Sequence, residues 1–194
     1  MLTETQDPEL MKQVVAAARR CFGRYGVDRT TMVDIAKEAG IGRTGIYRLG
    51  VTRPEITQAA IVTRLRELAE DIRPLAAKNA PFRKQLLETS LATVEVARSD
   101  PELKHLLDTT ETVSLHRLIT GPDSVMHEIV LDVLGPMLDR ARARGEIRAE
   151  VSNDRIAEWL RSVYLMLILR DDLDTAGEKA LINDFVLPSL LAQP

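Results

Sequence analysis

The chain has 194 residues, enough to bury a substantial core as one domain or as one domain with a small appendage. Hydrophobic residues make up 45%, charged residues 28% and aromatic residues 4%, a composition that suits packed helices better than strands. A single cysteine excludes an internal disulfide. No apolar run is long enough to cross a membrane and the N-terminus lacks the pattern of a secretory signal, so we expect a cytoplasmic protein.

The net charge of −3 argues against a nucleic-acid partner, but the charges are unevenly distributed. Residues 1–53 carry nine Lys or Arg against six Asp or Glu, whereas residues 54–194 carry seventeen against twenty-three. The basic charge therefore lies at one end of the chain. This distribution is expected if only that end binds a polyanion.

Helical periodicity and capping signals predict an all-α fold of about nine helices. The first covers residues 8–25, and Gly26 is expected to end it as a left-handed cap. A second, short helix starts at Thr31, where the run to Asp34 has the form of a capping box, and it ends at Gly40. A third follows over residues 42–49.

Longer helices are predicted in the rest of the chain. Thr52 is placed to cap a helix that reaches about residue 73, with Pro74 beyond it. Further helices are predicted over residues 82–98, a short segment from 101, and residues 124–144, 153–169 and 175–192. No strand pattern or internal repeat occurs in the sequence.

The segment from Ile35 to Arg48 has the spacing of a helix-turn-helix. Two helices that cross closely need a small residue in the first, a glycine at the turn and an aliphatic residue in the second. Ala36, Gly40 and Ile46 meet these needs at that spacing. An ordinary helical hairpin is the alternative.

The outward positions of the second helix carry hydrogen-bond donors and small groups instead of an apolar stripe. Arginine can bind guanine in the major groove, threonine can contact a base edge, and tyrosine commonly reaches a phosphate. A phosphate can also bind at the helix start at Thr31 and at Arg53. The predicted DNA-binding residues are Thr31, Arg43, Thr44, Gly45, Tyr47, Arg48 and Arg53.

Four segments together resemble the TetR family of bacterial transcriptional regulators. They are VVAAARRCFGRYG at residues 14–26, TTMVDIAKEAGI at 30–41, IYR at 46–48 and TRPEI at 52–56. The resemblance implies a DNA-binding domain at residues 1–53 and a helical effector-binding and dimerisation domain at residues 54–194. It also implies that Thr31, Tyr47 and Arg53 contact phosphate and that residues 43–45 read bases.

The sequence departs from the family pattern in the third predicted helix. Gly42 occupies a position where serine is common, and Thr44-Gly45 reverses the usual Gly-Thr order. Leu49-Gly50 replaces a pair of aromatic residues, the second of which normally packs under this helix. Since the loss of a buried aromatic side chain is costly, we expect a loosely held recognition helix.

A dimer is expected, because one DNA-binding domain offers few contacts and two copies can read a palindromic operator. The last two helices are its predicted interface. Residues 163–169 carry apolar side chains on every side of the helix, which indicates that other segments or a partner subunit cover it on several sides. Some of the apolar stripes on the last two helices must nevertheless pack within the monomer. The predicted interface residues are Ile156, Leu160, Val163, Leu167, Ile182, Phe185, Val186 and Leu190.

A small hydrophobic effector is expected to bind in the second domain and to release the double-stranded DNA operator. For each candidate residue taken alone, a plain core position is the favoured alternative. The predicted lining residues are Leu87, Val94, Leu107, Val113, Met126, Ile129, Met137, Trp159 and Tyr164.

No cofactor, catalytic residue or metal site is predicted. The histidines His105, His116 and His127 do not have the spacing of metal ligands, and no phosphate loop, dinucleotide turn or nucleophile elbow occurs. The sequence therefore predicts a ligand-responsive repressor without enzymatic activity. The alternatives are a ligand-independent DNA binder, a helical interaction protein and, least favoured, an all-helical enzyme.

Overall fold

The computed structural model describes residues 7–108 and 124–192 of the chain. Its helices are α1 (Pro8–Tyr25), α2 (Met32–Glu38), α3 (Arg43–Arg48), α4 (Arg53–Ala76), α5 (Phe82–Ser99), α6 (Pro101–Asp108), α8 (Val125–Ala143), α9 (Asn153–Ile168), α10 (Thr175–Leu181) and α11 (Leu187–Leu190). A π-helical turn, η1 (Ile182–Val186), joins α10 to α11 without a break. If α10, η1 and α11 are counted as one continuous helix, the described residues form nine helices. The predicted all-α fold is confirmed.

The described chain divides into two compact units, and α4 contributes to both. The first unit contains residues 7–64 and 101–108, which comprise α1, α2, α3, the beginning of α4, and α6. The second contains residues 65–100 and 124–192. The predicted boundary after residue 53 falls at the start of α4, whereas the compact units divide inside this helix, after Arg64.

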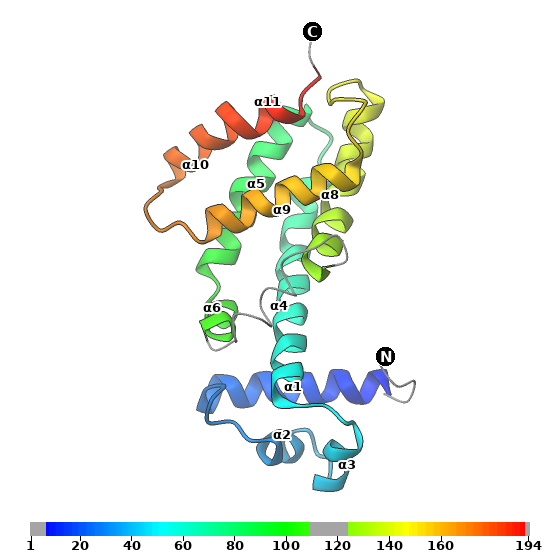
Figure 1. Ribbon diagram of the computed structural model, residues 1–194, viewed down its shortest axis with the longest axis vertical. Coiled ribbons are helices and arrows are strands. Elements are labelled where there is room, and N and C mark those ends of the chain that lie inside the picture. The colour runs from blue at the N-terminus through cyan, green and yellow to red at the C-terminus, as the bar shows by residue number, and fades with distance from the viewer. Residues whose placement is uncertain (1–6, 109–123, 193–194) are drawn as a thin grey trace. The chain divides into compact units, whose positions relative to one another are not determined.

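The first unit is built on the apolar face of α1, with α2 and α3 on one side of it (Figure 1). Asp7 caps α1 by accepting hydrogen bonds from the N–H groups of Glu9 and Leu10. Burial of small and aliphatic side chains against this face removes apolar surface from water and holds the short helices in place. The buried residues are Val14, Val15, Ala17, Ala18, Cys21 and Phe22 of α1, Ile35 and Ala36 of α2, Ile46 of α3, and Ile56, Ala60 and Ile61 of α4.

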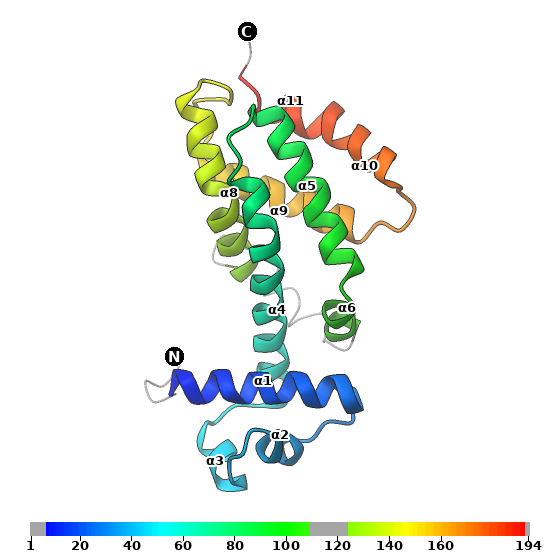
Figure 2. The ribbon, with the colours of Figure 1, turned by 180° about the vertical axis from the view of Figure 1, so that it is seen from behind.

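The second unit packs α9 against α5 and α8. Figure 1 shows α9 crossing in front of α5, and Figure 2 shows α5 from the opposite side. Tyr164 lies in this core, where its hydroxyl is 3.0 Å from the hydroxyl of Ser90. Burial raises the pKa of Tyr164 to about 12.

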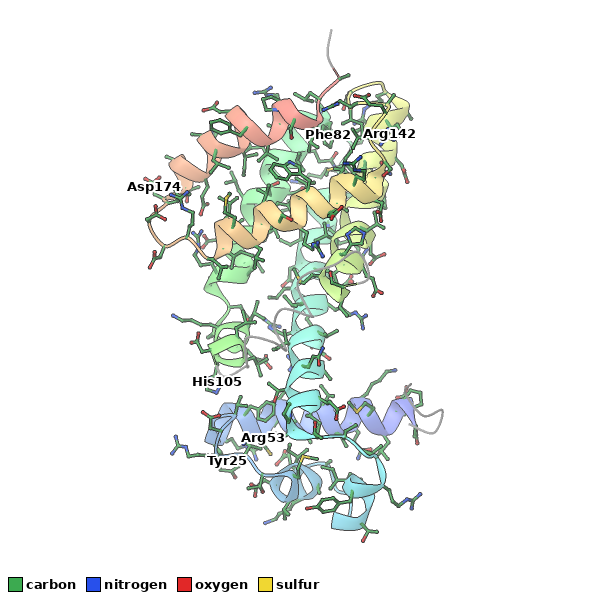
Figure 3. The ribbon with its side chains drawn as sticks, in the orientation of Figure 1. Tyr25, Arg53, Phe82, His105, Arg142 and Asp174 are labelled. Atoms are coloured by element: carbon green, nitrogen blue, oxygen red, sulfur yellow. The ribbon has the colours of Figure 1, made fainter. Side chains whose placement is uncertain are left out.

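Side chains distant in sequence hold the helix ends of the second unit. Gln85 of α5 donates to the carbonyls of Ala76 and Lys78 at 2.7 and 2.6 Å, which satisfies the end of α4. Arg142, labelled in Figure 3, donates to the carbonyl of Arg148 at 3.0 Å and to Asn153 Oδ1 at 2.9 Å. This guanidinium therefore fixes the turn between α8 and α9.

Three helix ends differ from the prediction. Helix α4 continues past Pro74 to Ala76, because a proline in the last turn removes only one backbone hydrogen bond. Helix α9 is capped by Ser152 and not by a residue at 153 or 154. Gly26 ends α1 with φ 83° and ψ 154°, which is not the left-handed helical conformation that we expected.

Candidate nucleic-acid interface

Helices α2 and α3 form the predicted helix-turn-helix. Ala36 is 2% exposed and Ile46 is fully buried, while Gly40 at the turn has φ 68°. The N–H of Ile41 donates to the carbonyl of Ala36 at 3.0 Å, so the chain reverses immediately after α2. A residue other than glycine would be strained at this φ, which explains the glycine at position 40.

Helix α3 exposes one face to solvent and buries the other. Ile46 and Leu49 point into the core at 0% and 7% exposure, whereas Tyr47 is 58% exposed and Thr44 and Arg48 are also exposed. Arg43 is the first residue of the helix, and the backbone of Gly45 lies against Ile41. The helix thus presents a polar face without an apolar stripe.

Thr31 caps α2 in the predicted capping box with Asp34. The Thr31 hydroxyl donates to Asp34 Oδ2 at 2.6 Å, and the N–H of Asp34 donates to Thr31 Oγ1 at 3.2 Å. The hydrogen bonds from Thr31 lower the pKa of the Asp34 carboxyl. A phosphate at this helix start would therefore have to displace the Asp34 carboxylate from the threonine hydroxyl.

Arg53 lies at the start of α4 and ties this helix to the loop after α1. Its Nη1 donates to the carbonyl of Asp28 at 2.9 Å and to that of Val27 at 3.4 Å. The preceding residue, Thr52, binds Glu55 through both its N–H and its hydroxyl, and these bonds lower the Glu55 pKa. Since a guanidinium has five N–H donors, Arg53 retains donors for a further anion.

An ion-pair cluster fixes α2 against α1, and our sequence reasoning missed it. Glu38 accepts from Arg20 Nε at 2.6 Å and from Arg24 Nη1 at 2.9 Å. The hydrogen bond from Arg20 is the main cause of the lowered pKa of Glu38. Separations of 14 and 18 residues leave no periodic signal from which this cluster could have been predicted.

The helix-turn-helix has counterparts in known proteins. Residues 14–49 match the family model described as bacterial regulatory proteins, tetR family. The chain is 26% identical over 190 residues to the HTH-type transcriptional regulator TtgR of Pseudomonas putida, with 91% of this chain and 89% of the relative covered. The matched segment contains the complete helix-turn-helix. Residues 14–49 therefore carry a helix-turn-helix of the TetR type.

Solved TetR-family structures share the fold of this chain across nearly its whole length. A transcriptional regulator from Pectobacterium atrosepticum has a TM-score of 0.69 at 18% identity, with 96% of each chain covered. The repressor FadR of Thermus thermophilus, solved in complex with lauroyl-CoA, has a TM-score of 0.66 at 19% identity, with 95% of this chain and 96% of that chain covered. The proteins to which this chain is similar are thus DNA-binding transcriptional regulators with a helix-turn-helix.

The predicted effector-lining residues do not all lie in the same part of the structure. Val94, Met137 and Tyr164 are core residues of the second unit, with Leu87 packed against them. Met126 and Ile129 are half-buried on α8, Leu107 belongs to the first unit, and Val113 lies outside the described residues. The side chain of Trp159 is 45% exposed, and its indole N–H donates to Ser189 Oγ at 3.2 Å.

Most of the predicted dimer-interface residues are buried within the protomer. Phe185 is 70% exposed, but the other predicted residues are at most 4% exposed inside the protomer. Their own chain covers them. The buried residues are Ile156, Leu160, Val163, Leu167, Ile182, Val186 and Leu190.

Within residues 7–108 and 124–192, no helix combines the length and the apolar character that a membrane span requires. The same residues contain no group of three metal-binding side chains. His127 is buried and its Nε2 lies 2.8 Å from Asp154 Oδ1, His105 is exposed on α6, and His116 lies outside the described residues.

Proposed function

We propose that this TetR-family regulator is a repressor that binds a palindromic operator as a dimer and leaves it when a small hydrophobic ligand binds. In this proposal residues 1–53 bind DNA, and residues 54–194 bind the effector and dimerise. The observation that carries it is the division of α3 into a buried side at Ile46 and an exposed polar face. A helix with this division can enter a major groove without losing its packing.

The residues of α3 have complementary roles in the proposed complex. Arg43 and Thr44 lie in the first turn of α3 and Gly45 follows them, where the family resemblance places base contacts. Tyr47 and Arg48 are exposed farther along the helix and suit contacts to phosphate. Thr31 and Arg53 would add phosphate contacts from α2 and α4, Arg53 through the N–H groups that do not bind the α1–α2 loop.

A second protomer would supply the other half of the operator contacts. Trp159 and Met166 are partly exposed and lie seven residues apart on α9, so they share one side of that helix. Phe185 is exposed on η1. Exposed large apolar side chains of this kind favour a protein interface, and we place the dimer contact on these three residues.

The hydrophobic effector is supported by the residue chemistry of the second unit and by one relative. The core contains apolar side chains together with a buried pair of hydroxyls at Ser90 and Tyr164, a combination typical of ligand sites. The Thermus thermophilus repressor was solved with lauroyl-CoA, a ligand with a long apolar chain. Release requires that the ligand bind more tightly to the DNA-free state.

Operator binding by variants of α3 tests this proposal. Duplexes selected from random DNA by the purified protein provide the probe, and their symmetry tests the palindrome. We expect Arg43→Ala with Tyr47→Ala to weaken binding about 100-fold, because it removes a base contact and a phosphate contact at each half-site. Fluorescence anisotropy measures the affinity. Binding equal to that of the wild type would contradict the proposed interface.

The matched control is Arg155→Ala, which removes an exposed arginine from α9. Its affinity should equal that of the wild type. The salt dependence adds an independent criterion, since log K should fall linearly with log salt with a slope of roughly −0.9 for each neutralised phosphate. A helical interaction protein would show neither the selected duplexes nor this slope.

A further inference from the structure

The first unit contains an open hollow of about 760 Å³ that DNA binding through α3 does not use. It is lined by the second half of α1, by Arg29 in the loop after α1, and by α6. Figure 3 shows its two labelled lining residues, Tyr25 at the end of α1 and His105 on α6, at the same end of this unit. Its volume lies within the range of roughly 300–1,000 Å³ that is typical of small-molecule sites.

Arginine dominates the lining of this hollow, which we call the α1–α6 groove. Four guanidinium groups, those of Arg19, Arg20, Arg24 and Arg29, face a single lining carboxylate, Glu102, among the described residues. A cationic recess of this kind raises the local concentration of anions.

The existing ion pairs leave the groove with an excess of positive charge. Arg19 binds Glu102 through two hydrogen bonds of 2.6 and 2.9 Å. Arg20 and Arg24 share one carboxylate, that of Glu38, which lies outside the groove. Arg29 is exposed and forms no ion pair with the residues that the structure describes. One shared carboxylate cannot neutralise two arginines, so about two positive charges remain.

Apolar surface lies beside these cations. Phe22 of α1 and Leu106 of α6 lie behind the groove and, at 2% and 1% exposure, offer almost no surface to a ligand. The ring of Tyr25 is half exposed, and nothing lies within 4 Å of the position that a Cβ on Gly23 would occupy. The groove therefore has room for a flat apolar group next to its arginines.

We propose that the α1–α6 groove binds a small organic phosphate. The phosphate group would accept hydrogen bonds from Arg24 and Arg29, and the apolar part would lie over Gly23 beside Tyr25. Arginine suits this chemistry because its planar fork of donors matches two oxygens of a phosphate. A DNA backbone offers the same phosphate groups, but these groups would leave the apolar lining of the groove uncovered.

Calorimetric titration of the full-length protein tests the proposal with adenosine monophosphate, inorganic pyrophosphate and adenosine as probes. We expect both phosphates to bind and adenosine to give no measurable binding. The variant Arg29→Ala should weaken binding of the monophosphate about tenfold, since a charge-assisted hydrogen bond is lost. Arg29 forms no ion pair with the described residues, so this substitution should leave the fold intact. Circular dichroism checks that it does.

Two more variants distinguish a built groove from nonspecific attraction of phosphate to surface arginines. Glu102→Gln removes the only carboxylate among the described lining residues and should tighten monophosphate binding several-fold. Arg83→Ala removes an exposed arginine from α5 and should have no effect. The proposal is overturned if neither phosphate binds at about 5 mM, or if Arg29→Ala and Arg83→Ala behave alike. A loss of operator affinity in Arg29→Ala with unchanged monophosphate binding would assign Arg29 to DNA and also overturn it.

Discussion

Gly26 shows how a single backbone conformation ends α1. Its φ of 83° with ψ of 154° lies in a region that only glycine adopts readily, and its N–H donates to the carbonyl of Phe22 at 2.9 Å. The chain can then turn so that the carbonyl of Gly26 accepts from the buried hydroxyl of Thr30 at 2.8 Å. The α1–α2 loop, which carries Asp28 and Arg29, starts from this residue.

Two glycine substitutions in and after α1 should have opposite effects on stability. Gly26→Ala should lower the free energy of unfolding by about 1–3 kcal/mol, because alanine is strained at this φ and ψ. Gly23→Ala should raise it by about 0.5–1 kcal/mol, because Gly23 is helical and a Cβ there meets open space. Chemical denaturation measures both. Equal effects would contradict this explanation of the turn.

Helix α3 is the least supported helix of the first unit. It has six residues, its cap residue Gly42 makes no side-chain hydrogen bond, and Gly45 lies within it. Ile46 and Leu49 provide its buried apolar contacts. Leu49 thus partly fills the core beside α3, whereas Gly50 has a φ of 64° and ends the helix without a side chain. A short helix with few buried contacts opens readily.

Amide exchange should therefore be faster in α3 than in α4, which has 24 residues. We expect Gly45→Ala to slow exchange in α3 and to stabilise the helix by about 0.5–1 kcal/mol. A Cβ at this position would meet Ile41 Cβ at 3.5 Å, an ordinary contact. Hydrogen exchange followed by mass spectrometry or NMR measures both effects. Protection in wild-type α3 equal to that in α4 would show that the helix is not loosely held.

The proposed dimer depends on which apolar side chains the protomer leaves uncovered. The inward stripe of α9 is used within the protomer, while Trp159, Met166 and Phe185 stay partly exposed. The indole of Trp159 is held by Ser189 of α11, which orders one part of this surface. Aromatic side chains held in this way lose little entropy when a partner binds.

Phe185→Glu should convert the proposed dimer to monomer at micromolar concentration. The substitution places a charge in the contact and removes an aromatic anchor, which typically costs about 2 kcal/mol or more, a factor of about 30 in affinity. Light scattering after size-exclusion chromatography gives the mass. The control is Val33→Glu, which changes an exposed apolar residue of α2 and should leave the mass unchanged. A dimer that persists in Phe185→Glu would exclude this surface.

Local interactions made most helices and the helix-turn-helix predictable from the sequence. The Thr31 and Asp174 caps each bond to a residue three positions along the chain, and Ala36, Gly40 and Ile46 lie within eleven residues. Such contacts follow from helical periodicity and need no knowledge of distant segments. The exposed polar side of α3 could be predicted for the same reason, because burial of Ile46 directs its neighbours outward.

Long-range contacts could not be predicted in this way. Glu38 reaches back to α1, and Arg53 reaches back to the carbonyl of Asp28. An apolar stripe shows that a helix face is covered, but covering by the same chain and covering by a partner leave the same pattern of residues. Packing of α9 against α5 and α8 decided that Leu160 and Val163 belong to the protomer core and that Phe185 remains exposed. Burial depends on which helices meet in three dimensions, and that is a property of the whole chain.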